Sequence, residues 1–158
     1  MELFFFNFPL LAALIGIVFA QIVKIPIQFI ATREFKPGLA FSTGGMPSSH
    51  SAAVAAVSTG IGLQEGFSTG IFAVSTVFSI IIMFDASGVR RQAGEQAILL
   101  NTLVKDFSHF VEEAKVWGKK QDYQKQEELK ELLGHQPIEV FFGGLSGVLI
   151  ALVLFPLV

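Results

Sequence analysis

Four stretches of mostly apolar or small residues alternate with polar segments along the chain. Residues 4–23, 67–84 and 138–158 are strongly apolar, whereas residues 47–63 are rich in Ser, Ala and Gly. A helix needs about 20 mostly apolar residues to cross the hydrocarbon core of a bilayer. The three apolar stretches therefore predict membrane spans. The fourth predicts a helix packed among them, because small residues let helix backbones approach closely.

The positions of the basic residues predict an orientation. All 11 Lys and Arg residues fall within residues 24–36 or 90–130. With four crossings both regions lie on the same side, and an excess of Lys and Arg marks the cytoplasmic side of a membrane protein. We therefore expect an integral membrane protein, in a plasma membrane of bacterial type, with both termini outside.

The long segment 91–134 predicts a cytoplasmic helical insertion. Apolar residues recur at alternating steps of four and three over residues 91–116, which is typical of an amphipathic helix, and the polar stretch 119–133 predicts a second, solvated helix. The apolar stripe could pack on the bundle, on membrane headgroups or on a second copy, and packing within the protein is the simplest of these. Gly143 and Gly147 form a small-xxx-small helix-contact face, which leaves a homo-oligomer open.

Composition and charge agree with a membrane protein. The chain is 52% hydrophobic and contains 17 Phe and no Cys. Its net charge of -2 argues against nucleic-acid binding, which needs a basic surface. The lack of Cys excludes disulfides and thiolate chemistry. We predict an all-α fold over residues 1–158: a polytopic membrane helical bundle, a single membrane domain with about four membrane-embedded helices plus a cytoplasmic amphipathic helical insertion.

A first candidate site lies in the run 44–50, Gly-Gly-Met-Pro-Ser-Ser-His. Proline suits the opening position of a helix, and the free N–H groups of a helix start bind anions. With the hydroxyls of Ser48 and Ser49 they predict an anion cradle, to which His50 adds a proton donor. A Ser-capped helix with an incidental His explains the same residues about equally well.

A second candidate is the pair His135 and Glu139, four residues apart at the head of the last span. On a helix these positions share a face. The carboxylate can then accept the proton of one ring nitrogen and leave the other as a nucleophile or base. The alternative is a polar cluster at the head of the span, but a carboxylate at the edge of hydrocarbon is costly without a partner.

Basic residues supply the remaining candidates. Arg90 and Arg91 follow the third span, where the positive-inside rule explains them in part, although guanidinium groups also suit phosphate oxygens. Asp85 at the membrane boundary needs a cationic or hydrogen-bonding partner. Three further basic residues, each as well explained as a snorkelling anchor, are Lys24, Arg33 and Lys36.

Over nearly its whole length the sequence resembles the divergent branch of the type-2 phosphatidic acid phosphatase superfamily, related to acid phosphatases and vanadium-dependent haloperoxidases. The superfamily pattern is a Lys and an Arg-Pro after one helix, then Pro-Ser-Gly-His, then Ser-Arg followed by a His with an acid four residues later. Here Lys24 stands for the first Lys, and Arg33 or Lys36-Pro37 stands near the Arg-Pro. Residues 47–50 match the second motif with Ser in place of Gly. The third motif is matched by Arg90 or Arg91, after Ser87, and by His135 with Glu139.

The resemblance implies a mechanism. His135 would attack phosphorus to give a phosphohistidine, Glu139 would orient it, and His50 would protonate the leaving oxygen, with no metal or other cofactor required. The residues expected to hold phosphate are Lys24, Arg33, Lys36, Ser48, Ser49, Arg90 and Arg91. One departure is large: residues 92–134 separate Arg91 from His135, where the superfamily has a short spacer. This insertion must fold back and return His135 to the basic cluster.

The leading hypothesis is therefore a membrane phosphatase that hydrolyses a phosphomonoester or pyrophosphate headgroup of a phospholipid or polyprenyl phosphate at the cytoplasmic face. An inactive protein that binds or translocates lipid phosphate is the alternative. A structural protein that assembles through the stripe of residues 91–116 is a third.

Overall fold

The computed structural model describes residues 7–33, 35, 38, 44–115 and 134–157. These residues form helices and no strand, which confirms the predicted all-α fold. The predicted solvated helix over residues 119–133 lies outside the described residues. The elements are α2 (Phe8–Thr32), α3 (Ser49–Glu65), α4 (Gly70–Ser87), α5 (Val89–Lys115), α6 (Pro137–Leu154) and the short 3-10 helix η2 (Phe155–Leu157).

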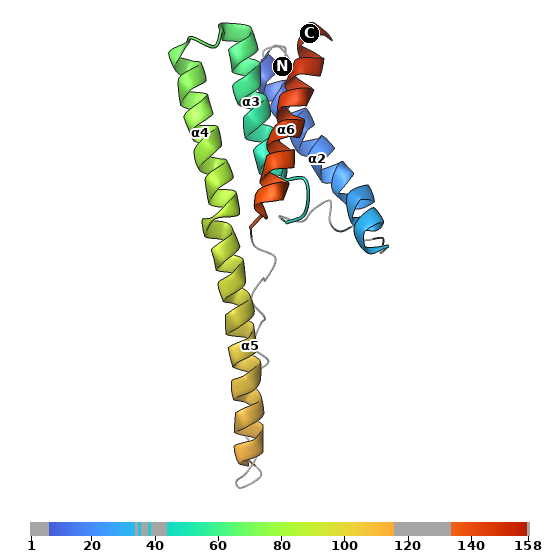
Figure 1. Ribbon diagram of the computed structural model, residues 1–158, viewed down its shortest axis with the longest axis vertical. Helices are drawn as coiled ribbons and strands as arrows, with labels where there is room; N and C mark the ends of the chain where they lie inside the picture. Colours follow the sequence, from blue (N-terminus) through green and yellow to red (C-terminus); the bar gives the residue numbers. More distant parts are fainter. Residues whose placement is uncertain (1–6, 34, 36–37, 39–43, 116–133, 158) are drawn as a thin grey trace.

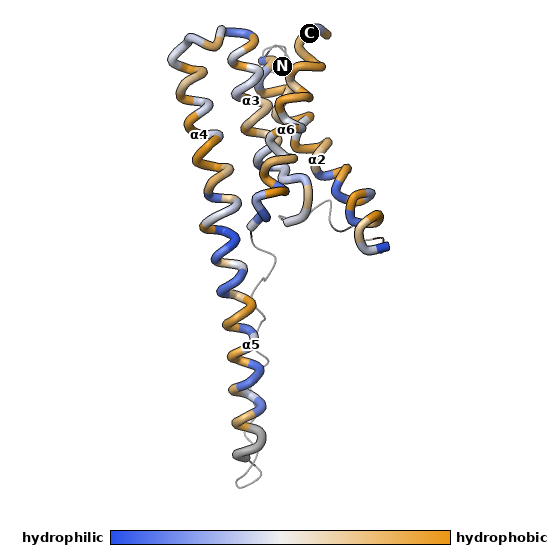
Figure 2. The backbone as a smooth tube through the Cα atoms, in the orientation of Figure 1, coloured by the Kyte–Doolittle hydropathy of each residue, from blue (hydrophilic) through white to orange (hydrophobic). Residues whose placement is uncertain are grey.

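Among the described residues, three helical stretches are long and apolar enough to cross a membrane. They are Phe8–Thr32, Gly70–Val111 and Pro137–Leu157, and each contains most of one of the three strongly apolar segments of the sequence. In Figure 2 the apolar colour follows α2, α4 and α6, whereas polar and apolar residues alternate along α5. Helix α3, with 17 residues, is shorter and less apolar, so its crossing of the bilayer stays a prediction.

The first span extends further than the sequence suggested. Helix α2 begins at Phe8, after Asn7 accepts a hydrogen bond from the Leu10 N–H, and it ends only at Thr32. Apolar residues continue past position 23, and Pro26 is accommodated within the helix. Lys24, expected to follow the span, therefore lies inside it.

Helix α3 lies in the middle of the bundle and contacts α2, α4 and α6. Its buried residues are small: Ser49, Ser51, Ala52, Ala55, Ala56, Ser58, Gly60 and Gly62. The Ser58 and Ser79 hydroxyls join it to α4 through a hydrogen bond of 2.7 Å. The prediction that this small-residue segment packs among the other helices is confirmed.

The glycine face of α6 is used within the chain. A Cβ at Gly143 would collide with the Ser48 carbonyl oxygen, and one at Gly147 would collide with that of Ala52. The backbones of α6 and α3 therefore touch along this face, as small residues permit. Gly143 and Gly147 thus serve a contact between helices of one chain.

The described ends of the chain lie at one end of the helix bundle, and the starts of α3 and α6 lie at the other. Helix α2 begins where η2 ends, and the rings of Phe8 and Phe155 lie 5.3 Å apart between centroids. Helices α3 and α6 both begin at the opposite end, where α4 passes into α5 (Figure 1). Residues 47–50, Arg90, Arg91, His135 and Glu139, which lie at the starts of α3, α5 and α6, are gathered at that opposite end.

Helix α5 continues from α4 after Gly88 and extends beyond the ends of the other helices (Figure 1). Its range, Val89–Lys115, agrees with the predicted amphipathic helix. Among the described residues, the expected packing of its stripe within the protein is found at the near end: Ala97 is buried, whereas Leu100, Val104 and Phe107 are exposed. The reason is geometric, because α5 leaves the bundle after its first few turns.

Candidate active site at one end of the bundle

The far end of the insertion returns to the junction of α4 and α5. The His135 N–H donates to the Ala86 carbonyl oxygen at 2.9 Å. Just before it, Gly134 has a φ of 88° and lies so close to the backbone of Arg90 and Arg91 that no Cβ would fit. A positive φ and a close backbone approach are both conditions that favour glycine. The predicted return of His135 to the basic cluster is confirmed.

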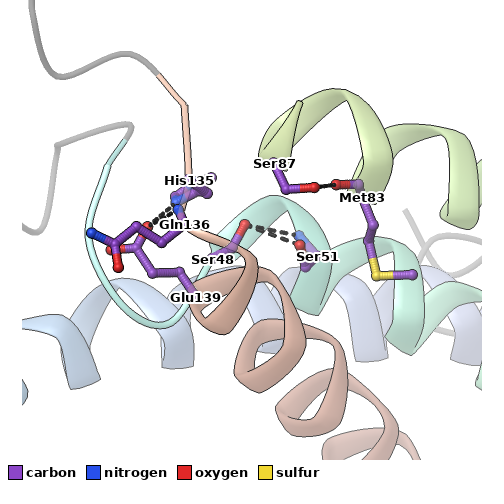
Figure 3. A network of polar contacts seen from close by, with 7 residues as sticks. All are labelled: Ser48, Ser51, Met83, Ser87, His135, Gln136 and Glu139. Atoms are coloured by element: carbon purple, nitrogen blue, oxygen red, sulfur yellow. Dashed lines mark hydrogen bonds and ion pairs between the residues drawn. The ribbon is translucent and has the colours of Figure 1, made fainter. Parts of the chain in front are cut away.

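His135 is buried, with 2% of its surface exposed, and its ring is oriented by Glu139. The Nδ1 and Glu139 Oε2 atoms are 3.0 Å apart, and the Gln136 N–H donates to the same oxygen at 3.1 Å (Figure 3). With the carboxylate as acceptor, the neutral His135 tautomer that fits this contact has its proton on Nδ1 and its lone pair on Nε2. Nε2 has no hydrogen-bond partner among the described residues.

The turn before α3 is hydrogen-bonded to the backbone of Glu139, the residue whose carboxylate orients His135. The Ser48 N–H donates to the Glu139 carbonyl oxygen at 2.9 Å. The Ser48 Oγ accepts hydrogen bonds from the N–H and the Oγ of Ser51, at 3.3 and 3.1 Å (Figure 3). Ser48 is thus the N-cap of α3. Pro47 precedes this cap and does not open the helix, contrary to expectation.

This capping directs Ser48 and Ser49 inward. Both residues are buried, and the backbone N–H of Ser48 is engaged within the chain. The anion cradle predicted from the Ser48 and Ser49 hydroxyls and the free N–H groups of the helix start stays a prediction, and in the structure the Ser48 Oγ caps α3. The turn fixes the start of α3 against α6.

His50 follows in the first turn of α3 and is exposed. Its ring lies beside that of His135, with centroids 6.1 Å apart and planes inclined at 61°. The charges of Arg90 and Lys24 act on it electrostatically. The two histidines expected to flank one site are thus neighbours, although they are 85 positions apart in the sequence.

Lys24 reaches this site from within α2. It is 2% exposed, and its charge interacts with that of Glu139. Its side chain comes close to the turn at Gly45, because a Cβ added to that glycine would lie 3.9 Å from Lys24 Cδ. A cation buried in an apolar helix is costly and is found mainly where function requires it.

Each of the two adjacent arginines has an acidic partner. Arg90 Nε and Asp85 Oδ2 are 2.6 Å apart, which confirms the expectation that Asp85 has a cationic partner. Arg91 Nε and Glu95 Oε1 are 2.9 Å apart. Both pairs are largely exposed, so each contributes little to stability and can exchange with another anion at small cost.

Two predicted phosphate ligands are not placed in this group. Arg33 ends α2 in a left-handed conformation, it is exposed, and no hydrogen bond or ion pair among the described residues joins its side chain to the site. Lys36 lies outside the described residues. The structure thus gathers Lys24, His50, Arg90, Arg91, His135 and Glu139 but leaves Arg33 apart.

A pocket of about 240 Å³ adjoins His135. Its lining combines the turn before α3, the first turns of α5 and the start of α6: Gly44, Gly45, Arg91, Gly94, Glu95, Ile98, Gly134, His135, Gln136 and Glu139. Sequence reasoning did not single out Gly134, Glu95 or Gln136. The spacing of Arg91 and Glu95, four residues apart on a helix, was the available signal for Glu95.

Chemically, the arrangement offers an oriented imidazole with a free lone pair, a second imidazole beside it, and cations around both. This set suits attack on phosphorus, protonation of a leaving oxygen and stabilisation of phosphoryl oxygens.

Comparison with known proteins agrees with the membrane fold. A protein of Bacillus subtilis (strain 168), described as "Uncharacterized membrane protein YuiD", is 62% identical over 148 residues, which cover 94% of each chain. No solved structure matches the chain. The model of the Divergent PAP2 family matches residues 5–150, which include every residue of the site described above. The chain therefore belongs to the Divergent PAP2 family.

Proposed function

We propose that this protein is a membrane lipid-phosphate phosphatase that uses His135 as its nucleophile. The observation that carries the proposal is the state of the His135 ring. Its Nδ1 is held by Glu139 at 3.0 Å, its Nε2 has no partner among the described residues, and the His50 ring is 6.1 Å away. A nucleophile oriented by an acid and placed next to a proton donor is the general plan of covalent catalysis.

In the proposed reaction the Nε2 lone pair of His135 forms a bond to phosphorus as the bond to the leaving oxygen breaks. His50, in its protonated form, gives a proton to that oxygen. Water then attacks the phosphohistidine and passes a proton to His50, and the nitrogen–phosphorus bond breaks to release inorganic phosphate. Lys24, Arg90 and Arg91 stabilise the phosphoryl oxygens throughout, which is the main task of a phosphoryl-transfer site.

We further propose that the site faces the cytoplasm. Arg91 lines the pocket beside His135 and the charges of Arg90 and Lys24 act on His50, so the site is basic, and Lys and Arg are enriched on the cytoplasmic side. The substrate would be a phospholipid or polyprenyl phosphate, whose acyl or prenyl chains stay in the bilayer beside the apolar faces of α2, α4 and α6.

Phosphate release from phosphatidate and from polyprenyl pyrophosphate in proteoliposomes tests this proposal. We expect release without added metal, inhibition by vanadate, and loss of turnover in His135→Ala. Glu65→Gln, an exposed substitution at the far end of α3, is the control that should keep full activity. Full turnover by His135→Ala would contradict the proposal.

One observation favours a second function, binding or translocation of lipid phosphate without chemistry. The His135 residue is 2% exposed, whereas the side chains of Arg90 and Arg91 are exposed, so a phosphate reaches the arginines more readily than the His135 ring. A protein of this kind would bind phosphatidate vesicles equally well after His135→Ala and less well after Arg90→Ala. It would release no phosphate.

A further inference from the structure

The pocket beside His135 has a lining that differs from that of a simple phosphate site. It contains Arg91, but also the acidic residues Glu95 and Glu139 and the amide of Gln136. A carboxylate accepts hydrogen bonds and repels phosphate oxygens. Its natural partners in a ligand are hydroxyl groups, which donate hydrogen bonds.

The pocket is also larger than one phosphate needs. Liquid water takes about 30 Å³ per molecule, so the pocket of about 240 Å³ has room for roughly eight water-sized groups, whereas a phosphate has only five heavy atoms. The pocket shares His135 and Glu139 with the candidate active site. A group bound there is therefore next to the phosphate that His135 would attack.

Glu95 is the carboxylate available for such a ligand. Glu139 already accepts hydrogen bonds from His135 and Gln136 through Oε2. Glu95 instead forms an exposed pair with Arg91, at 2.9 Å and on the wall of the pocket. Exposed pairs of this kind are weak, so both side chains can turn to a ligand: Arg91 to phosphate oxygens and Glu95 to hydroxyls.

We propose that this pocket is a subsite for a polyol phosphate, the hydroxyl-bearing and phosphorylated part of a headgroup, and that Glu95 selects it. This inference rests on the proposed phosphatase function. The same chemistry occurs in a lipid whose headgroup is a phosphorylated glycerol and in soluble glycerol 3-phosphate. Phosphatidate has the phosphate without a free hydroxyl and serves as the reference substrate.

The experiment measures phosphate release from these three compounds by the full-length protein in proteoliposomes. The variants are Glu95→Ala and Asp106→Ala, an equally exposed acid further along α5 that does not line the pocket. We expect Glu95→Ala to raise KM for the phosphoglycerol lipid about tenfold, with kcat little changed, because a hydrogen bond to a charged group is lost. KM for phosphatidate should stay the same or fall, since Arg91 is released. Asp106→Ala should match the wild type for all three.

The possible results distinguish a failure of the proposed subsite from a failure of the proposed phosphatase function. A preference for glycerol 3-phosphate over the lipid would identify the soluble compound as the source of the polyol. An equal effect of Glu95→Ala on phosphatidate and on the phosphoglycerol lipid, or no effect on either, would overturn the subsite. If no compound releases phosphate, the proposed function fails. The subsite is then judged by binding of vesicles containing the phosphoglycerol lipid, and equal binding by wild type and Glu95→Ala overturns it.

Discussion

The Nε2 atom of His135 is a buried polar atom with no hydrogen-bond partner among the described residues. Leaving such an atom unpaired costs about 1–3 kcal/mol. The same ring is held firmly on its other side, where Glu139 accepts a hydrogen bond from Nδ1 at 3.0 Å. A free lone pair on an otherwise fixed ring is what a nucleophile requires.

Lys24 provides a prediction at the scale of a single residue. Lys24→Met keeps the length and apolar character of the stem but removes a charge that is 98% buried, since the residue is 2% exposed. Removing one partner of a buried charge interaction leaves the other charge, here that of Glu139, uncompensated and lowers stability. We expect a lower Tm together with at least about tenfold weaker inhibition by vanadate, because a charge-assisted hydrogen bond to the anion is lost.

The control is Lys105→Met, on the part of α5 that has left the bundle. It should leave vanadate inhibition unchanged. A Lys24→Met variant that binds vanadate as tightly as the wild type would remove Lys24 from the phosphate site.

At the scale of elements, the site depends on three segments that meet at one end of the bundle. The turn before α3 is joined to α6 by the Ser48–Glu139 hydrogen bond, and the start of α6 is joined to α4 by the His135–Ala86 hydrogen bond. Neither bond is a contact between sequence neighbours. The two together fix His50 and His135 relative to each other.

Gly134→Ala tests the second of these connections, the His135–Ala86 hydrogen bond. Alanine at a φ of 88° costs roughly 1–2 kcal/mol, and its Cβ would also collide with the backbone of Arg91. We expect the His135–Ala86 contact to open and kcat to fall at least about a hundredfold, with helix content by circular dichroism unchanged, because correct placement of a catalytic group contributes effects of this size.

Gly144→Ala is the matched control two turns into α6. An added Cβ there meets only the Met83 Sδ at 3.4 Å, which is the flexible end of a side chain. This variant should keep nearly full activity. Equal kcat values for the two variants would show that Gly134 does not position His135.

At the scale of the whole molecule, the arrangement of the ends bears on the orientation in the membrane. Phe8 and Phe155 are in contact at one end, and the site lies at the other. The turn between α3 and α4 lies at the same end as the described termini (Figure 1). Our proposal places that end outside the cell and the site inside.

Single cysteines test this orientation cleanly, since the chain has no Cys of its own. Ser68→Cys, exposed in the turn between α3 and α4, should react with an impermeant maleimide in intact cells. Asp106→Cys on α5 should react only after the membrane is permeabilised. The reverse pattern would place the site outside the cell, and reaction at both positions in intact cells would rule out a cytoplasmic site.

Much of this organisation could be predicted from local sequence patterns. Apolar runs identified the spans, small residues placed α3 inside, and the spacing of His135 and Glu139 predicted their hydrogen bond. Bilayer thickness and the size of side chains at helix contacts determine the first two features. The third belongs to the start of α6, because His135 lies just before the N-cap Gln136.

The remaining features depend on contacts between distant segments. The inward turn of Ser48 follows from its bond to Glu139, 91 positions later in the sequence, and the pocket at Glu95 exists only because Gly134 returns to Arg91. No local pattern encodes these two outcomes. The position of Arg33 has another origin, because it follows from the length of α2, which the apolar residues after position 23 indicate.

The most direct test of the account is to trap the phosphorylated enzyme. The purified protein in proteoliposomes is given phosphatidate with a radiolabelled phosphate, quenched in alkali, which preserves phosphohistidine, and the labelled peptide is sequenced. We predict label on His135, stable in alkali and lost in acid, and none in His135→Ala. Label on another residue, or sustained phosphate release by His135→Ala, would contradict the central claim that the His135 Nε2 atom attacks phosphorus.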